Sequence, residues 1–191
     1  NMTPGTKPRL YFKKSTDANT YAGNTNADNG WKYVEASNAA SPFSFTTNFA
    51  LLQAAVAPGD VIQYFVVAQD NAGTPNVGIN SGTFASTPAS VALTAGAFPL
   101  TGTINSYNIA ATLPTSITIG AAGTYPTLTG VGGFFAALNT GALGGNTTVT
   151  ILDAAVTETG ANALNAINYG CAGGPYTLTI KPATGVTTVL S

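Results

Sequence analysis

Apolar and aromatic side chains occupy every second position in several short segments of the first half of the chain, which is the pattern of β-strands. The run Asp60–Asp70 carries apolar residues on both faces, as expected of a central strand. Arg9–Lys14 carries Leu10 and Phe12 on one face and charged residues or tyrosine on the other, which predicts a one-sided strand. The other strands expected in this half are Trp31–Ala36, Ser41–Thr47, Thr83–Phe84 and Ser90–Thr94.

These strands, separated by loops rich in Asn, Asp, Ser and Gly, predict a β-sandwich of the immunoglobulin or fibronectin III kind over residues 1–112. Tyr64 is expected to be its buried corner tyrosine. Because such a sandwich needs about seven strands and the segments above supply fewer, we expect a partial sandwich whose first strands precede Asn1. An unpaired strand edge is then expected at Arg9–Lys14.

The second half, residues 113–191, alternates Thr or Ser with Val, Ile or Leu in short segments separated by long loops. The strands expected here are Ser116–Gly120, Thr147–Leu152, Tyr176–Pro182 and Thr187–Leu190. The segment 127–139 differs, because its apolar residues recur at spacings of three and four: Val131, Phe134, Phe135 and Leu138. This spacing predicts a helix over 127–139, with Thr127 or Thr129 as its N-cap.

Short strands that alternate in Thr, together with a single amphipathic helix near their start, predict the opening coils of a right-handed parallel β-helix whose end the helix covers. The sequence as a whole therefore predicts an all-β fold. We expect a partial immunoglobulin or fibronectin III-like sandwich followed by the N-terminal coils of a parallel β-helix, with the domain boundary near Ala110–Thr115.

Charged residues are few and unevenly placed. They make up 7% of the chain, against about 25% in typical soluble proteins, and the chain has no His. Ten of the thirteen lie in the first 70 positions, and only Asp153, Glu158 and Lys181 follow. Three scattered ionisable groups do not form an acid and base pair, so we expect neither enzyme activity nor a cofactor.

Partners of two classes are excluded by the same composition. A net charge of −1 offers no cationic patch for nucleic acid. No apolar run approaches the roughly 20 residues of a membrane span, so we expect no membrane insertion. The single Cys171 has uncharged neighbours and is expected to be unreactive.

One loop contains a partial calcium-binding pattern. Residues with side-chain oxygens stand at positions 1, 3, 5 and 12 of that pattern: Asn24, Asn26, Asp28 and Glu35. Gly30 stands one place later than the glycine of the pattern, and Trp31–Ala36 alternates like a strand where a helix should begin. We expect an Asn/Asp turn between strands, with calcium as the weaker alternative.

The same region contains the aromatic residues Trp31, Tyr33, Tyr11 and Tyr21. An exposed platform of such rings would stack on sugars and indicate glycan binding. Aromatic residues that alternate along sandwich strands more often form core or cross-strand pairs. The sequence therefore favours packing, with glycan binding as the alternative.

Two sets of segments resemble a known group of proteins, and together they cover most of Pro8–Pro182. The first set is similar to a repeated module of very large surface proteins of Bacteroidetes-type bacteria: PRLYFKKST, DNGWKYVEA, PFSFT, GDVIQYFVVAQD and NVGINSGTF. The second resembles the β-helix entry segment of the same proteins: ITIGAAGTYPTLTGVGGFFAALN, NTTVTILDAAVTETG and YTLTIKPATG. Such proteins are exported, commonly by the type 9 secretion route, and many are adhesins or gliding-related components. The resemblance therefore implies a secreted, cell-surface or filament-forming protein.

We expect a non-catalytic segment of such a protein, acting through contacts of its strand edges at Arg9–Lys14 and Thr187–Leu190. The expected partners are other segments of the same protein or identical subunits, with surface glycans or a secretion apparatus as further candidates. The alternative is a carbohydrate-binding module attached to a β-helix polysaccharide enzyme whose active site lies outside this chain.

Overall fold

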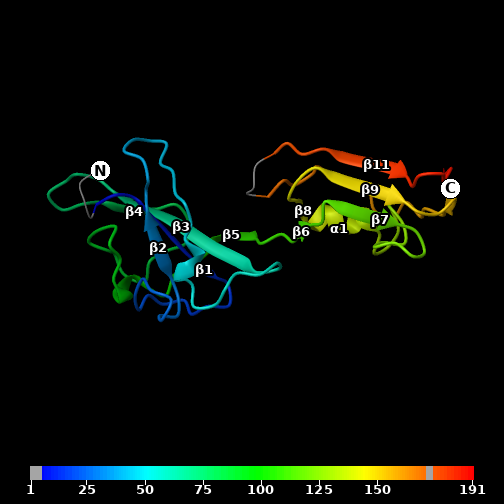
Figure 1. The fold of residues 1–191 in the computed structure, drawn as a ribbon. Coiled ribbons are helices and arrows are strands. Elements are labelled where there is room, and N and C mark those ends of the chain that lie inside the picture. Colours follow the sequence, from blue (N-terminus) through cyan, green and yellow to red (C-terminus); the bar gives the residue numbers. More distant parts are fainter. Residues whose placement is uncertain (1–5, 171–173) are drawn as a thin grey trace. The chain divides into compact units, whose positions relative to one another are not determined.

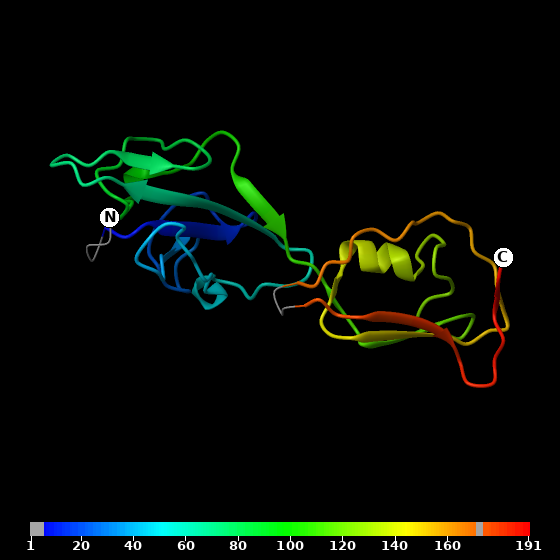
Figure 2. The same cartoon turned by 90° about the horizontal axis from the view of Figure 1, so that it is seen from above.

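The computed structural model describes residues 6–170 and 174–191 and is mostly β (Figures 1 and 2). Cys171 lies outside the described residues. The chain divides into two compact units, Asn1–Ile109 and Ala110–Ser191. Each unit has its own buried cluster of apolar side chains, so each is stabilised by a core of its own.

The first unit is built on an antiparallel sheet in which the described strands follow the order β2-β1-β3-β4, with β5 also paired to β3. The strands are β1 (Arg9–Lys14), β2 (Lys32–Glu35), β3 (Val61–Gln69), β4 (Val77–Ile79) and β5 (Asn105–Asn108). As predicted, the long strand β3 is central, because it pairs with β1 on one side and with β4 and β5 on the other.

Strand β1 is also central, and the expectation of an unpaired edge at Arg9–Lys14 is wrong. Leu10 pairs with Val34 of β2 on one side and with Val66 of β3 on the other. All six residues of β1 are buried, so the strand is not one-sided either. Alternation in the sequence shows which side chains share a face, but it does not show whether another part of the chain covers the polar face.

An irregular segment, residues 84–100, covers one face of this sheet. Its buried side chains pack with those of β1 and β3: Val91, Leu93, Ala97, Phe98 and Leu100. The strands expected at Ser41–Thr47 and Ser90–Thr94 are absent, and at Thr83–Phe84 only Thr83 forms an isolated bridge, with Thr101. Two short 3-10 helices, Phe49–Leu51 and Ala95–Ala97, lie among these loops.

In the described residues of the second unit, the strands form three small parallel sheets. Strand β6 (Thr112–Leu113) pairs with β8 (Ala142–Leu143), and β10 (Ala155–Val156) pairs with β12 (Val189–Leu190). The largest sheet has the order β11-β9-β7, with β7 (Ser116–Ile119), β9 (Thr147–Ile151) and β11 (Leu178–Pro182). The arrows of these three strands run in the same direction in Figure 1.

Successive strands of each parallel sheet recur at a regular sequence distance of about 30 residues. Ile117 of β7 pairs with Val149 of β9, which pairs in turn with Ile180 of β11. Since side chains alternate between the two faces of a strand, these three side chains form one column on the inner face. Leu113 and Leu143 stand in the same relation in β6 and β8.

Among the described residues the only α-helix is α1 (Phe134–Thr140), which is shorter than the helix expected over 127–139. Gly133 occupies the N-cap position without a side-chain hydrogen bond, and Gly132 adopts a φ of 73°, which a helix cannot accommodate. Thr127 does not cap the helix: its Oγ1 accepts a hydrogen bond from Gly130 N at 3.0 Å and closes a turn before the helix.

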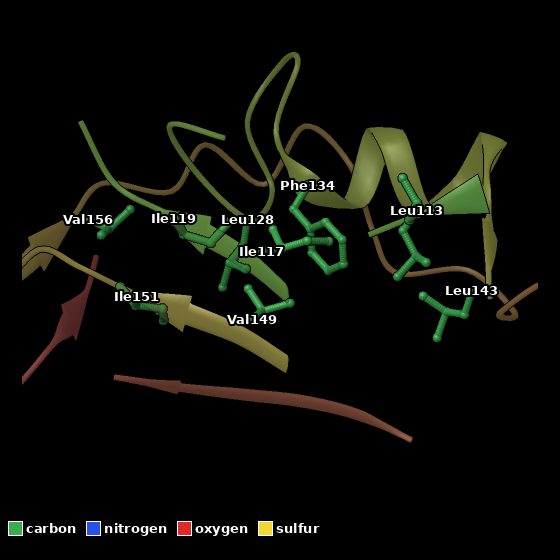
Figure 3. Packing of buried hydrophobic residues seen from close by; sticks show 10 residues of the cluster. Leu113, Ile117, Ile119, Leu128, Phe134, Leu143, Val149, Ile151 and Val156 are labelled. Carbon is green, nitrogen blue, oxygen red and sulfur yellow. The ribbon is translucent and has the colours of Figure 1, made fainter. Parts of the chain in front are cut away.

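The core of the second unit lies between α1 and the parallel strands (Figure 3). Phe134 and Leu138 of α1 pack with inward-facing residues of β7 and β9, including Ile117 and Val149. Figure 2 shows α1 on the opposite side of this core from β9 and β11. Burial of one face of each element therefore holds the unit together.

Candidate functional site

The aromatic residues considered for glycan stacking form the core of the first unit. Trp31 and Tyr11 are fully buried. The rings of Tyr11 and Phe65 are stacked with centroids 5.1 Å apart, and Trp31 meets Phe65 edge-on at 4.8 Å. A ring without exposed surface has no face to offer a sugar, so the hypothesis of a platform on Trp31 and Tyr11 is wrong for this structure.

The other two aromatic residues, Tyr33 and Tyr21, are half-buried, and each ring contacts other side chains of the same unit. The guanidinium carbon of Arg9 lies 4.0 Å from the centre of the Tyr33 ring, a cation–π contact. Tyr21 packs against Tyr11 with centroids 6.1 Å apart. Both rings therefore extend the core rather than form a separate surface.

The tyrosine with the buried anchoring role is Tyr11 rather than Tyr64. The Tyr11 hydroxyl donates to the Val91 carbonyl at 2.9 Å and accepts from Leu93 N at 3.0 Å. It thereby fixes the irregular covering segment to the sheet. Tyr64 is only half-buried and packs on Tyr107, with centroids 5.8 Å apart.

Two buried lysines organise the loop between β1 and β2. Lys13 Nζ donates to the carbonyl oxygens of Lys14, Ser15 and Asp17 at 3.0, 3.4 and 3.0 Å. Lys32 Nζ donates to those of Gly23 and Asp28 at 3.1 and 2.7 Å. Burial lowers the pKa of both lysines. Each ammonium group satisfies backbone carbonyls that the irregular loop leaves without helix or sheet partners.

The calcium candidates take part in separate hydrogen bonds. Asn24 caps the Tyr33 backbone, accepting from its N at 2.7 Å and donating to its carbonyl at 3.2 Å. Asp28 accepts from Thr25 N and Oγ1, at 3.2 and 2.7 Å. Glu35 forms an ion pair with Arg9 at 3.1 Å, and Asn26 is exposed beside a shallow hollow.

The structure does not bring these four side chains together into an oxygen cage. No group of three or more acidic, His or Cys side chains within residues 6–170 and 174–191 is placed to hold a metal ion. The positive charge at this loop is supplied by Lys32, whose ammonium binds the Asp28 carbonyl.

Both acidic residues of the second unit bind backbone groups that lie about 30 residues earlier in the chain. Asp153 Oδ2 accepts from Ala121 N at 2.7 Å. Glu158 accepts from Leu128 N and Thr129 N, at 2.8 and 2.7 Å, and from Thr129 Oγ1 at 2.6 Å. Within the described part of the chain, none of these bonds joins either carboxylate to a second ionisable group. Their role is to hold turns in place.

Hollows with volumes of about 290, 330 and 570 Å³ lie on the described part of the first unit. The first two share Thr87 and Pro88, and the third lies beside Phe49. None of the residues that line them is ionisable. They offer shape and hydroxyl or amide groups, but no acid, base or charged ligand for chemistry.

The most distinctive surface of the second unit is the outer edge of β11. The inward column that begins with Ile117 and Val149, 1% and 0% exposed, ends with Ile180 at 38%. A second column lies in the separate sheet of β10 and β12, where Val156 is 4% exposed and its neighbour Leu190 is 49% exposed. Apolar side chains that are buried in the earlier strands are therefore exposed in the last ones.

The edge of β11 was not identified from the sequence, although its chemistry is visible there. Lys181 and Pro182 end the alternating run, and this pair is typical of an edge strand. Strand β1, where an open edge was expected because too few strands were counted, is instead paired on both sides.

No family model, curated protein or solved structure matches this chain. In the described residues, no helix is long and apolar enough to cross a membrane.

Proposed function

We propose that this chain is a non-catalytic structural or adhesive segment of a large secreted cell-surface or filament-forming protein, and that it acts by strand-edge contacts. The observation that carries the proposal is the edge of β11, where Ile180 exposes the end of an otherwise buried column; Leu190 of β12 exposes the end of a second column in the sheet of β10 and β12. Exposed apolar side chains beside unpaired strand groups favour contact with another strand.

The proposed architecture is a partial immunoglobulin or fibronectin III-like sandwich followed by the first coils of a right-handed parallel β-helix. The five-stranded antiparallel sheet supports the first part, with residues 84–100 in the place of a second layer. The recurrence of parallel pairs about every 30 residues supports the second. The short helix α1 then covers the first coil.

The chemistry of the ionisable groups supports a role without catalysis. The carboxylates of Asp153 and Glu158 are engaged with backbone donors, and the buried ammonium groups of Lys13 and Lys32 are engaged with backbone carbonyls. Groups held in this way stabilise loops. Secretion and surface location are part of the proposal through the resemblance of the sequence segments, and the partners are neighbouring segments of the same protein or identical subunits.

Light scattering on the whole chain over a range of concentrations tests the proposal. We expect a mass above 19.1 kDa that rises with concentration, because unpaired edges meet more often. A double variant, Ile180→Lys with Leu190→Lys, should shift association to higher concentration. Leu164→Lys is the matched control, since Leu164 is similarly exposed but lies outside the parallel sheets. A monomer at every concentration would contradict the proposal.

A further inference from the structure

We infer that the outer edge of β11 binds an extended segment that runs parallel to β11 and alternates β-branched apolar residues with hydroxyl residues. This inference rests on the proposed function, because it specifies the partner chemistry of one edge. We call the side of β11 that faces away from β9, at Leu178 and Ile180, the open edge.

The hydrogen-bond register identifies the backbone groups of the open edge. Thr147 N of β9 donates to the Thr177 carbonyl at 2.8 Å, and Ala183 N donates to the Ile151 carbonyl at 2.8 Å. Odd-numbered residues of this segment therefore direct their peptide groups toward β9. In a parallel ladder alternate residues point to opposite neighbours, so Leu178 and Ile180 direct their N–H and C=O groups outward. No described strand pairs there.

The apolar column defines the side chains that a partner needs. Ile180 is exposed at the end of the column that Ile117 and Val149 begin. A partner strand that places a β-branched apolar residue beside Ile180 removes that surface from water and continues the packing. On the face of the same sheet that points away from the core, the side chains carry hydroxyl groups, as at Thr148 and Thr179. A partner that matches both faces alternates as β9 does.

The opposite edge of this sheet is covered, so strand addition is one-sided. Tyr125 forms a parallel bridge to Ile119 of β7. Tyr125 N donates to the Thr118 carbonyl at 3.1 Å, and Gly120 N donates to the Tyr125 carbonyl at 3.0 Å. Thr124 N also donates to Thr118 Oγ1 at 2.9 Å. A folded second copy therefore cannot offer β7 as the parallel partner, so folded copies that associate through Ile180 meet in another orientation, and the occupant that fits the parallel register is an extended segment.

Pro182 limits where the partner can pair. Its even-numbered position directs its nitrogen outward, and proline has no N–H to donate. Lys181 beside it adds a charge that disfavours further pairing. The open edge is thus confined to Leu178 and Ile180, which fixes the register of an incoming strand and prevents indefinite growth along β11.

A labelled peptide with the sequence of residues 145–153 (GNTTVTILD) tests the inference, because it contains the strand that β11 already recognises. Fluorescence anisotropy with the whole chain, at concentrations where the chain is monomeric, should show saturable binding. The control peptide carries Thr in place of Val149 and Ile151 and should bind at least about tenfold more weakly, since it lacks the apolar face.

Two variants of the whole chain test the edge itself. Ile180→Pro removes the outward N–H, and Ile180→Lys removes the apolar side chain. Each should weaken peptide binding by about tenfold or more. Leu164→Lys should leave it unchanged. Thermal melts establish that the variants are folded; if Ile180→Pro unfolds, Ile180→Lys and the control peptide decide the result.

The direction of the bound strand is measured with a nitroxide on the peptide. At the peptide N-terminus, the nitroxide should broaden the NMR amide signal of Leu178 more than that of Ala183. The reverse pattern, absence of binding, or equal binding of the control peptide would overturn the inference. Concentration-dependent association that persists in such a case would leave the proposed function intact, whereas a permanent monomer that binds no peptide would reject both.

Discussion

Glu158 and Thr129 are joined by two hydrogen bonds, in which Glu158 Oε2 accepts from the Thr129 amide at 2.7 Å and from its hydroxyl at 2.6 Å. Oε1 accepts a third bond, from Leu128 N. One carboxylate therefore fixes the turn that leads into α1. The Glu158 side chain thus accepts hydrogen bonds from backbone N–H groups shortly before the helix, as N-cap side chains do at the start of other helices.

Replacing Glu158 with Gln should lower the free energy of unfolding by about 1–3 kcal/mol, because backbone donors lose a charged acceptor. Chemical denaturation measures this change. Glu35→Gln is the control, since Glu35 pairs with Arg9 at the partly exposed rim of the first unit and its loss should cost less than about 1 kcal/mol. Equal effects of the two substitutions would contradict the assigned role of Glu158.

The free energy of unfolding should depend on pH through the titration of Glu158. Burial raises the pKa of Glu158, but the hydrogen bonds from Thr129 and Leu128 outweigh it and hold the pKa below its ordinary value of 4.5. Since the folded-state pKa is depressed, the stabilisation is complete above the ordinary pKa and is lost as the pH falls through the folded-state pKa. Denaturation of the wild type and Glu158→Gln from pH 7 downward should show a smaller acid loss in the variant.

Tyr11→Phe should destabilise the first unit by about 1–3 kcal/mol. The change removes the hydroxyl that bonds both Val91 and Leu93 and leaves a buried carbonyl and amide without partners. Tyr64→Phe is a matched control, because Tyr64 is only half-buried and packs on Tyr107, apart from the core that Tyr11 anchors. Urea denaturation followed by tryptophan fluorescence, with Trp31 in the same core, reports the difference.

Lys32→Met should also destabilise the first unit, by about 1–3 kcal/mol, because the carbonyls of Gly23 and Asp28 lose their donor. The aliphatic part of the side chain is kept in this variant. Lys7→Met, at a position near the start of the described chain, should change little. If added calcium restored the stability of Lys32→Met, a cation site rather than a fixed ammonium would be indicated at this loop.

Phe134→Ala should lower the stability of the second unit by about 3–5 kcal/mol, since Phe134 is fully buried among the parallel strands. Val131, only three residues earlier, is largely exposed, and Val131→Ala should have no measurable effect. Thermal unfolding of both variants separates the two predictions. A large effect at Val131 would place the start of the helix where periodicity alone had put it.

The prediction that strand β3 is central is confirmed, because apolar residues on both faces of Asp60–Asp70 leave few other arrangements. The helix was predicted too long. Phe134, Phe135 and Leu138 keep the helical spacing, but Gly132 and Gly133 before them favour a turn, and this backbone effect outweighs the apolar spacing of Val131. Periodicity therefore located the buried face but not the boundary.

The candidate site could be predicted only in part. The paucity of ionisable groups in the second half was visible in the sequence, whereas their partners were not, because Glu158 meets Thr129 across 29 positions. The low number of predicted strands indicated an exposed edge at Arg9–Lys14, yet β1 is paired on both sides and Lys13 is buried by the backbone carbonyls that it binds. Burial of a charged side chain depends on such long-range or irregular contacts, which no local pattern records.

Residue-resolved hydrogen exchange of β11 in a dilute, monomeric sample tests the central claim most directly. The account predicts an alternation: the amides of Thr179 and Lys181, which point to β9, should be protected, and those of Leu178 and Ile180 should exchange rapidly. Protection of all four amides would mean that the edge is already covered, and exchange of all four would mean that β11 does not pair with β9. Either result would contradict a function based on this edge.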